Sequence, residues 1–550
     1  MNGRSPLPVA DRRRNETTRR AISKNVAELE FLLILYSCSF TGNVMSGPFT
    51  RRNENQMYRE TEVSRPYQWC AKLEFRATFS KEEKTMIEKR RPRIGLLGIM
   101  HGLYDEKQPE ITENQEKFAR DIVAHLKDVA DVYFPGAAKS RDLIEKFMKE
   151  FHEKELDGVM IIMLLYSPGL RLVQALQRNY LPLMLANIQP LPSVTKNWNW
   201  SLLTTNQGIH GAQDTANMIL RAGFKPAIIT EDWKSKAFTS FVDDWARAAR
   251  TAAELKRARI AIFGRMRGMG DIVGDDAAFF RKIGPEVNHE SIGDVYRYME
   301  SATNEEIERQ MAEDRKNFKL DPKLSEESHR YAVRLQLGFE KFLQEKNYDG
   351  FSPNFDVFKE DGRFKQIPML GASNLLAKGY GYSAEGDTHT VTMTLAGHIL
   401  IGNAHFTEMY SLDFEKDSAL MSHMGEGNWK IARKDRPIKL IDRELEIGGL
   451  ENPPTVVFSA QPGPATMVSL APIAGENYRL IVAKGDVLDT EELSDVPMPY
   501  FHFRPDTGVR ACMDAWLENG GTHHQVLFLG DHTRKWKMLC DILGIQYVKV

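Results

Sequence analysis

Apolar runs of strand length alternate with amphipathic stretches of helix length from Arg93 onward. Strands that are apolar along their whole length and alternate with helices are typical of a parallel sheet covered on both faces. This pattern predicts a doubly wound α/β domain over residues 93–257. Its expected strands are Arg93–Met100, Val129–Phe134, Gly158–Tyr166, Leu181–Ile188 and Pro226–Thr230, and its expected helices are Thr112–Leu126, Ser140–Glu155, Leu170–Arg178, Gln207–Ala222 and Trp233–Leu255.

The alternation continues into a second region and then changes. A strand is expected at Arg259–Gly264, with helices at Asn304–Lys316 and Ser325–Glu345. Beyond about residue 405, short β-branched runs are broken by glycine and proline, with one helix expected at Gly508–Glu518. The runs are Thr455–Ser459, Tyr478–Ala483 and Gln525–Leu529. The fold class is therefore α/β, with a central doubly wound domain over residues 258–405 and a β-rich C-terminal domain over residues 406–550.

Residues 1–92 lack this periodicity. Arginine-rich sequence precedes an apolar run, Phe31–Phe40, which superficially resembles a secretory signal. However, Glu28 and Glu30 adjoin the run, no small-residue cleavage site follows, and about ten residues are too few to span a bilayer. We expect a disordered extension, or a start assigned upstream of a true start near Met86. We expect a cytoplasmic protein that has no membrane partner.

The composition is that of an ordinary soluble globular protein. Of its 550 residues, 42% are hydrophobic and 27% are charged. Its 73 basic and 75 acidic residues give a net charge of -2, which argues against a nucleic-acid partner. Four scattered cysteines are too few for a disulfide framework and are expected to be reduced thiols.

Candidate chemistry is concentrated late in the chain. Eight of the fourteen histidines follow residue 380. Isolated acids and imidazoles stand there in glycine-rich or aromatic settings: Glu385, Glu408, His423 and the pair His523-His524. Two carboxylates and two imidazoles form a site suited to Mn²⁺, Co²⁺ or Mg²⁺, rather than a zinc site built from thiolates. Spacing alone leaves open that these histidines are ordinary surface or core residues.

One glycine-rich turn, Gly264–Asp271, follows the predicted strand of the second region. It matches neither a Walker A motif nor a dinucleotide-binding fingerprint, and no helix clearly starts on it. The turn is therefore a weak candidate for a nucleotide site, although it is suited to lining a polar ligand cleft.

Taken in order, the late motifs resemble those of the L-arabinose isomerase family. The resemblance covers nearly all of Arg93–Val550. Its late landmarks are Gly379–Asp387, Glu408 after an aromatic residue, Ser422–Met424, Ile447–Gly449, Phe458–Ala465 and Gly520–His524, and its early ones are His101–Tyr104 and Asn206–Gly211. Several landmarks in the same order are far more specific than any one of them.

The resemblance implies both an activity and a site. It implies an Mn²⁺-dependent enzyme, with Co²⁺ or Mg²⁺ as alternatives, that converts the monosaccharide L-arabinose to L-ribulose through a cis-enediol. Glu385 and Glu408 match positions that bind the metal and move the proton, while His423 and His524 match the imidazole ligands. His210 matches a histidine that reaches a neighbouring subunit's site, so the resemblance also implies a homo-oligomer with shared sites.

The chain departs from the family pattern where the sugar would lie. His101–Tyr104 carries an extra residue, Met100 replaces an expected polar residue, and Met409 stands where a second acid is usual. The turn Gly264–Asp271 has also diverged. The reaction class is therefore better supported than the substrate. L-Fucose, D-galactose or another pentose stays open as the substrate, as does a non-catalytic sugar-binding or regulatory relative.

Overall fold

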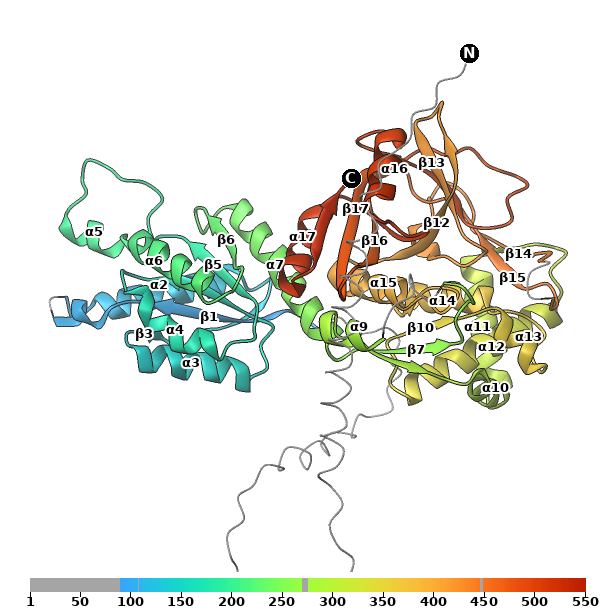
Figure 1. Cartoon of the computed structure of the whole chain (residues 1–550), viewed down its shortest axis with the longest axis horizontal. Helices are drawn as coiled ribbons and strands as arrows, with labels where there is room; N and C mark the ends of the chain where they lie inside the picture. The colour runs from blue at the N-terminus through green and yellow to red at the C-terminus, as the bar shows by residue number, and fades with distance from the viewer. Residues whose placement is uncertain (1–89, 107, 270–275, 446–448) are drawn as a thin grey trace, which may run out of the picture. The chain divides into compact units, whose positions relative to one another are not determined.

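The N-terminal part of the chain folds around a fully parallel sheet. The computed structural model describes residues 90–550 except 107, 270–275 and 446–448, so the expectation for residues 1–92 falls almost wholly outside the described residues. The strand order is β2-β1-β4-β5-β6, with β3 beside β1. Figure 1 draws this part of the chain in blue to green. The strands are β1 (Arg93–Ile99), β2 (Asp131–Tyr133), β3 (Ala137–Ala138), β4 (Gly158–Met163), β5 (Leu183–Asn187) and β6 (Ala227–Thr230).

Helices cover both faces of this sheet, as the continuous apolar strands predict. On β1 and β4, Leu96 and Ile162 belong to one core layer, which also contains Trp245 of α7. The neighbouring Leu97 and Ile161 face the opposite layer. The helical elements are η1 (Gly102–Glu106), α2 (Ile111–His125), α3 (Arg141–Glu153), η2 (Gly169–Leu172), α4 (Val173–Gln177), α5 (Trp200–Thr205), α6 (Gly208–Arg221) and α7 (Lys236–Leu255). A doubly wound α/β arrangement is confirmed for this region.

The central part contains a second parallel sheet, in the order β11-β10-β7-β8. Its strands are β7 (Arg259–Phe263), β8 (Glu286–His289), β10 (Gly350–Pro353) and β11 (Gly381–Tyr382). Phe263 and Phe351 both pack against Phe339 of α12, with ring centroids 5.6 and 5.1 Å apart. The helices are α9 (Asp276–Lys282), α10 (Ile292–Glu300), α11 (Asn304–Asn317), α12 (Glu326–Glu345), α13 (Asp356–Asp361), α14 (Met369–Lys378) and α15 (Thr388–Leu400).

The C-terminal part is β-rich, as expected, and six of its strands close into a ring. Antiparallel pairing runs through β16, β19, β12, β13, β18 and β17 and returns from β17 to β16, while β20 adds to β17 in parallel. The bounds are β12 (His405–Asp413), β13 (Ser418–Ser422), β16 (Gly463–Ile473), β17 (Asn477–Val487), β18 (Tyr500–Pro505), β19 (His524–Leu529) and β20 (Gln546–Lys549). Closure removes the free edges that an open antiparallel sheet would expose.

Smaller elements complete the described chain. A three-stranded sheet joins β9 (Lys319–Leu320) to β14 (Lys439–Asp442) and β15 (Pro454–Val457). The remaining helical elements are η3 (Trp429–Ile431), α16 (Val509–Glu518) and α17 (Thr533–Leu543). No helix among the described residues is both long and apolar enough to cross a membrane.

Candidate functional site

Three adjacent barrel strands bring together residues that are far apart in the sequence. Glu408 of β12 is directly opposite His524 of β19 and, on its other side, opposite Ser422 of β13. His423 immediately follows β13. Because directly opposed residues project from the same face of a sheet, this register places Glu408 and His524 side by side.

The second carboxylate, Glu385, comes from the central part of the chain. It lies in the turn between β11 and α15 with a φ of 67°, in the left-handed region. For a residue other than glycine this conformation costs about 1–2 kcal/mol. The turn is held by backbone hydrogen bonds, in which the Glu385 amide donates to the Pro353 carbonyl (2.8 Å) and its carbonyl accepts from the Met266 amide (2.9 Å).

The four predicted residues of the late motifs form one cluster. Nε2 of His524 lies 3.4 Å from a Glu408 oxygen and 3.6 Å from a Glu385 oxygen. Nε2 of His423 lies 3.9 Å from the other Glu408 oxygen. Ligand atoms that each bind one ion at about 2.1 Å lie about 3–4 Å from one another, so this spacing fits a shared cation. Nε2 of His524 is also buried without a hydrogen-bond partner among the described residues, as expected of a nitrogen that takes a ligand.

Two buried carboxylates outside the predicted set orient the imidazoles. Asp387 accepts from Nδ1 of His524 at 2.8 Å, and Glu426 accepts from Nδ1 of His423 at 2.9 Å. Glu426 also accepts from the Tyr382 hydroxyl at 2.7 Å. Each imidazole therefore turns its Nε2 toward Glu408, in the carboxylate–histidine arrangement that is common around metal ions.

Burial and charge shift the pKa values of these partners strongly. Burial opposes ionisation of Asp387, but its hydrogen bond with His524 and the charge of that ring outweigh it and lower the Asp387 pKa to about 2. Burial likewise opposes protonation of His423, yet the charge and hydrogen bond of Glu426, followed by the charges of Glu408 and Glu385, raise its pKa to about 9. In the metal-free protein, His423 and Glu426 therefore form an ion pair at neutral pH.

This ion pair predicts a pH-dependent stability of the metal-free protein. Because the pKa of His423 is about 9 in the folded chain and about 6.5 in an unfolded one, its stabilisation is full below pH 6.5 and is lost as the pH rises through 9. We expect the Tm to fall by a few degrees, on the order of 2–4 °C per kcal/mol lost, in thermal scans between pH 6.5 and 9. Glu426→Gln should flatten this part of the profile, and an unchanged slope in that variant would contradict the assignment.

His523 also lies beside this cluster, although the resemblance matched His524, and not His523, to a metal ligand. Its Nε2 lies 3.5 Å from a Glu408 oxygen and 4.0 Å from a Glu385 oxygen, and its ring packs on His524 with centroids 4.2 Å apart. Its side chain is 48% exposed, whereas that of His524 is 1% exposed. Two overlapping three-residue sets could hold an ion, Glu408 with His423 and His524, and Glu385 with His523 and His524.

The fifth predicted residue, His210, does not join this cluster. It lies exposed in the first turn of α6, in the N-terminal part of the chain. The two early landmarks do meet there, since the Gln207 side chain donates to the Tyr104 hydroxyl at 3.0 Å. The role of His210 therefore stays a prediction.

A cavity of about 250 Å³ opens beside the cluster. Glu385, Glu408 and His423 form its polar end. Most of the remaining lining is apolar, including Met266, Phe355, Ile367, Met424 and Leu445. The pocket can therefore hold a small molecule with its reacting end against the carboxylates.

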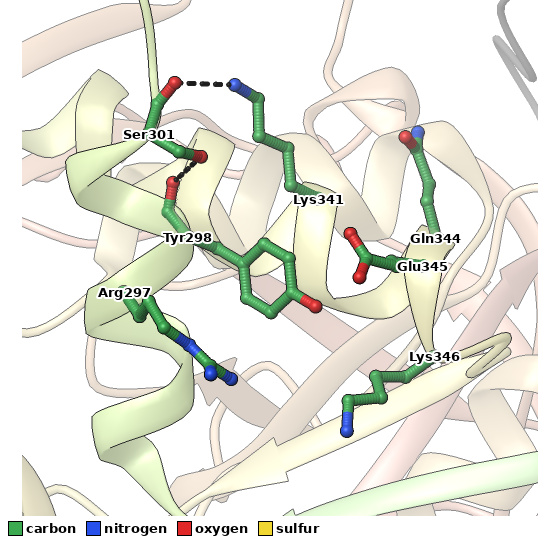
Figure 2. Close-up of a pocket in the computed structure, with 7 residues that line it drawn as sticks. All are labelled: Arg297, Tyr298, Ser301, Lys341, Gln344, Glu345 and Lys346. Atoms are coloured by element: carbon green, nitrogen blue, oxygen red, sulfur yellow. Dashed lines mark hydrogen bonds between the residues drawn. The ribbon is translucent and has the colours of Figure 1, made fainter.

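A larger surface cavity of about 790 Å³ lies between α10 and α12 (Figure 2). Its cationic side chains include two that already have carboxylate partners. Lys341 contacts the Ser301 carbonyl (3.2 Å) and Glu306 (2.7 Å), and Arg297 contacts Asp294 (3.0 Å). This cavity contains none of the predicted site residues.

Comparison with known proteins places nearly all of the described chain in one family. Sequence models of the L-arabinose isomerase N-terminal, central and C-terminal domains match residues 96–257, 259–402 and 403–546. The L-arabinose isomerase of Clostridium beijerinckii is 27% identical over 455 residues, which is 80% of this chain and 91% of the relative. That of Nocardioides sp. is 29% identical over 466 residues, with the same two coverages. L-Arabinose isomerase 2 of Clostridium acetobutylicum is 26% identical over 447 residues. With three consecutive domain matches and relatives aligned over most of their length, the chain belongs to the L-arabinose isomerase family and is an isomerase.

Proposed function

We propose that the protein converts L-arabinose to L-ribulose, with a divalent cation held by Glu385, Glu408, His423 and His524. The observation that carries the proposal is the convergence of these four side chains beside a small cavity, where Nε2 of His524 is buried and makes no hydrogen bond within the described part of the chain. Carboxylate and imidazole ligands favour Mn²⁺, with Co²⁺ or Mg²⁺ as alternatives. Bound there, the cation supplies Lewis-acid stabilisation of negative charge on the sugar oxygens.

The two glutamates are suited to the proton transfers. Aldose–ketose interconversion removes a proton from C2 and returns one to C1, through a cis-enediol. Burial acts to raise the Glu385 pKa, but His523, whose Nε2 is 4.0 Å away, and the charges of the other nearby histidines lower it, so Glu385 is ionised and can accept a proton. Glu408 lines the same cavity, where it can exchange the proton between the two sugar oxygens. The roles of the two glutamates can also be the reverse.

The substrate is tested by a panel of aldoses assayed with Mn²⁺. We expect ketose formation from L-arabinose with a kcat/KM at least about tenfold above that for L-fucose, D-galactose and other pentoses, since one well-placed contact contributes about 1.4 kcal/mol. A higher kcat/KM with another aldose would reassign the substrate but keep the reaction. Sugar binding without turnover of any aldose would favour a non-catalytic sugar-binding relative.

We propose further that the protein acts as a homo-oligomer whose sites are completed by His210 of a neighbouring subunit. The supporting observation is that His210 is exposed and that large apolar side chains near it are exposed as well: Trp200 (76%), Leu203 (53%) and Ile209 (41%). Exposed apolar surface of this kind marks a contact with another protein surface.

Shared sites predict complementation between inactive variants. His210→Asn and Glu408→Gln subunits should each be inactive alone, and a mixed oligomer should regain up to about a quarter of the activity, because one site type in four receives both intact residues. The measurement is ketose formation after subunit exchange, which is followed with differently tagged chains. Proven exchange without recovery would contradict the shared site.

We also propose a cytoplasmic location, without nucleic-acid or membrane partners. Both cysteines of the described chain, Cys512 and Cys540, are buried free thiols. Thiols of this kind are typical of a reducing compartment.

A further inference from the structure

The turn that follows β7 lies against the turn that carries Glu385. The Met266 amide donates to the Glu385 carbonyl at 2.9 Å. A Cβ atom added at Gly386 would lie 2.3 Å from the Gly264 carbonyl oxygen, so the two backbones are in direct contact. The first residues of the glycine-rich turn singled out in the sequence, 264–266, are thus packed against the candidate site.

Arg265 connects these two turns through its side chain. Its Nε donates to the Gly386 carbonyl at 3.3 Å, and its Nη2 donates to the Thr388 hydroxyl at 2.7 Å. These two acceptors flank Asp387 on either side in the sequence. The Arg265 side chain is only 24% exposed, so these hydrogen bonds are partly shielded from water.

The Arg265 guanidinium also has a partner outside the Glu385 turn. Asp276, the first residue of α9, accepts from Nη2 of Arg265 with one carboxylate oxygen. Its other oxygen lies 2.9 Å from Nε2 of His289, at the end of β8. Asp276, which is itself paired with His289, therefore holds the Arg265 guanidinium in addition to the contacts that Arg265 makes with the Glu385 turn.

The turn that Arg265 contacts controls two of the four proposed ligands. Glu385 is in the left-handed region of φ, a conformation that persists when surrounding contacts determine it. On the same turn, Asp387 accepts from Nδ1 of His524. A shift of this turn would therefore displace Glu385 directly and reorient His524 through Asp387.

We propose that Arg265 is a positioning residue that holds the Glu385–Asp387 turn in its metal-binding conformation. This assignment rests on the proposed function, because it concerns the same four ligands. Arg265 does not touch the reacting atoms in this role. It acts through Glu385 and Asp387, so its loss weakens cation binding although all four ligands remain present.

The test is Mn²⁺ affinity, measured by titration calorimetry on the full chain. Loss of a residue that orients metal ligands typically costs 10–100-fold in affinity, and we expect about that for Arg265→Met. Arg265→Lys keeps the charge but cannot make the same set of hydrogen bonds. Its Mn²⁺ affinity should therefore lie between that of the unaltered protein and that of Arg265→Met. The matched control is Arg267→Met in the same turn, because Arg267 is 90% exposed and its one ion-pair partner among the described residues is Glu360, at 3.5 Å. It should bind Mn²⁺ like the unaltered protein.

Amide hydrogen exchange in the metal-free protein separates positioning from general destabilisation. In Arg265→Met, exchange should rise at residues 385–388 while the Tm stays within a few degrees of the unaltered value. Unchanged Mn²⁺ affinity in Arg265→Met would overturn this assignment and leave the proposed function intact. An Arg265→Lys variant as weak as Arg265→Met, with exchange raised throughout the chain, would also overturn it in favour of a purely structural role. Absence of Mn²⁺ binding by the unaltered protein would instead overturn the proposed cation site, and this assignment with it.

Discussion

Replacing Glu408 or Glu385 by glutamine is expected to lower kcat by about two to four orders of magnitude, the usual contribution of a general acid or base. Glutamine has nearly the same size and shape, but it can neither accept the substrate proton nor supply a negative charge to a cation. Both side chains face the same small cavity and are about equally exposed, at 16–17%. The rate of ketose formation at saturating sugar and Mn²⁺ measures the effect.

A matched substitution on the same hairpin controls for charge and folding. Glu415 is exposed in the turn between β12 and β13, so Glu415→Gln removes the same charge at a distance from the cavity. We expect that variant to keep full activity, and all three variants should give the circular dichroism spectrum of the unaltered protein. Full turnover in either Glu385→Gln or Glu408→Gln would show that the carboxylate is not needed.

Removal of divalent cations is expected to abolish turnover, and added Mn²⁺ should restore it. The four ligands bring two carboxylates within reach of shared imidazoles in a largely buried cluster, and a bound cation offsets the repulsion between them. Mn²⁺ at about a hundred times its Kd should also stabilise the folded chain by about 2.7 kcal/mol, since it binds the native state. Activity assays and thermal unfolding of chelator-treated protein, with and without Mn²⁺, measure both effects.

Two histidine variants make this experiment specific. His524→Gln should lose the Mn²⁺-dependent rise in Tm, because its Nε2 is the buried nitrogen that lies near both glutamates. His523→Gln should retain most of that rise, since the His523 side chain is half exposed. An equal loss in both variants would assign His523 as a ligand, and full activity after chelation would count against a metal enzyme.

The sequence predicts the N-terminal parallel sheet well, the central sheet only through β7, and the barrel only in outline. Strands such as β1 and β4 are apolar at every position, so both their length and their burial on two faces can be read locally. Closure of the barrel depends on the pairing of β17 with both β16 and β18, which no local pattern encodes. Helix α15 lacks an amphipathic pattern because all thirteen of its residues are buried.

The residues of the candidate site were likewise predicted only in part. The resemblance supplied Glu385, Glu408, His423 and His524, and the structure brings these four side chains together. Asp387 and Glu426 were missed as imidazole partners. In the sequence, these two residues are marked only by being acids close to Glu385 and to His423. Nothing in the sequence shows that Asp387 faces an imidazole of a distant strand. That information comes from tertiary packing, which brings the Asp387 turn against His524 at the start of β19, whereas the register between β12 and β19 places His524 opposite Glu408.

The late position of β19 in the chain also sets the order in which the proposed ligands become available during synthesis. Domains generally fold as units while the ribosome is still extending the protein, the N-terminal ones first. Glu385, Glu408 and His423 then precede their last partner, because His524 opens β19, one of the final strands to emerge. The nascent protein can complete its two parallel sheets while lacking a whole ligand set. A chain truncated before β19 would therefore lack His524 and could not form the complete set of four proposed ligands.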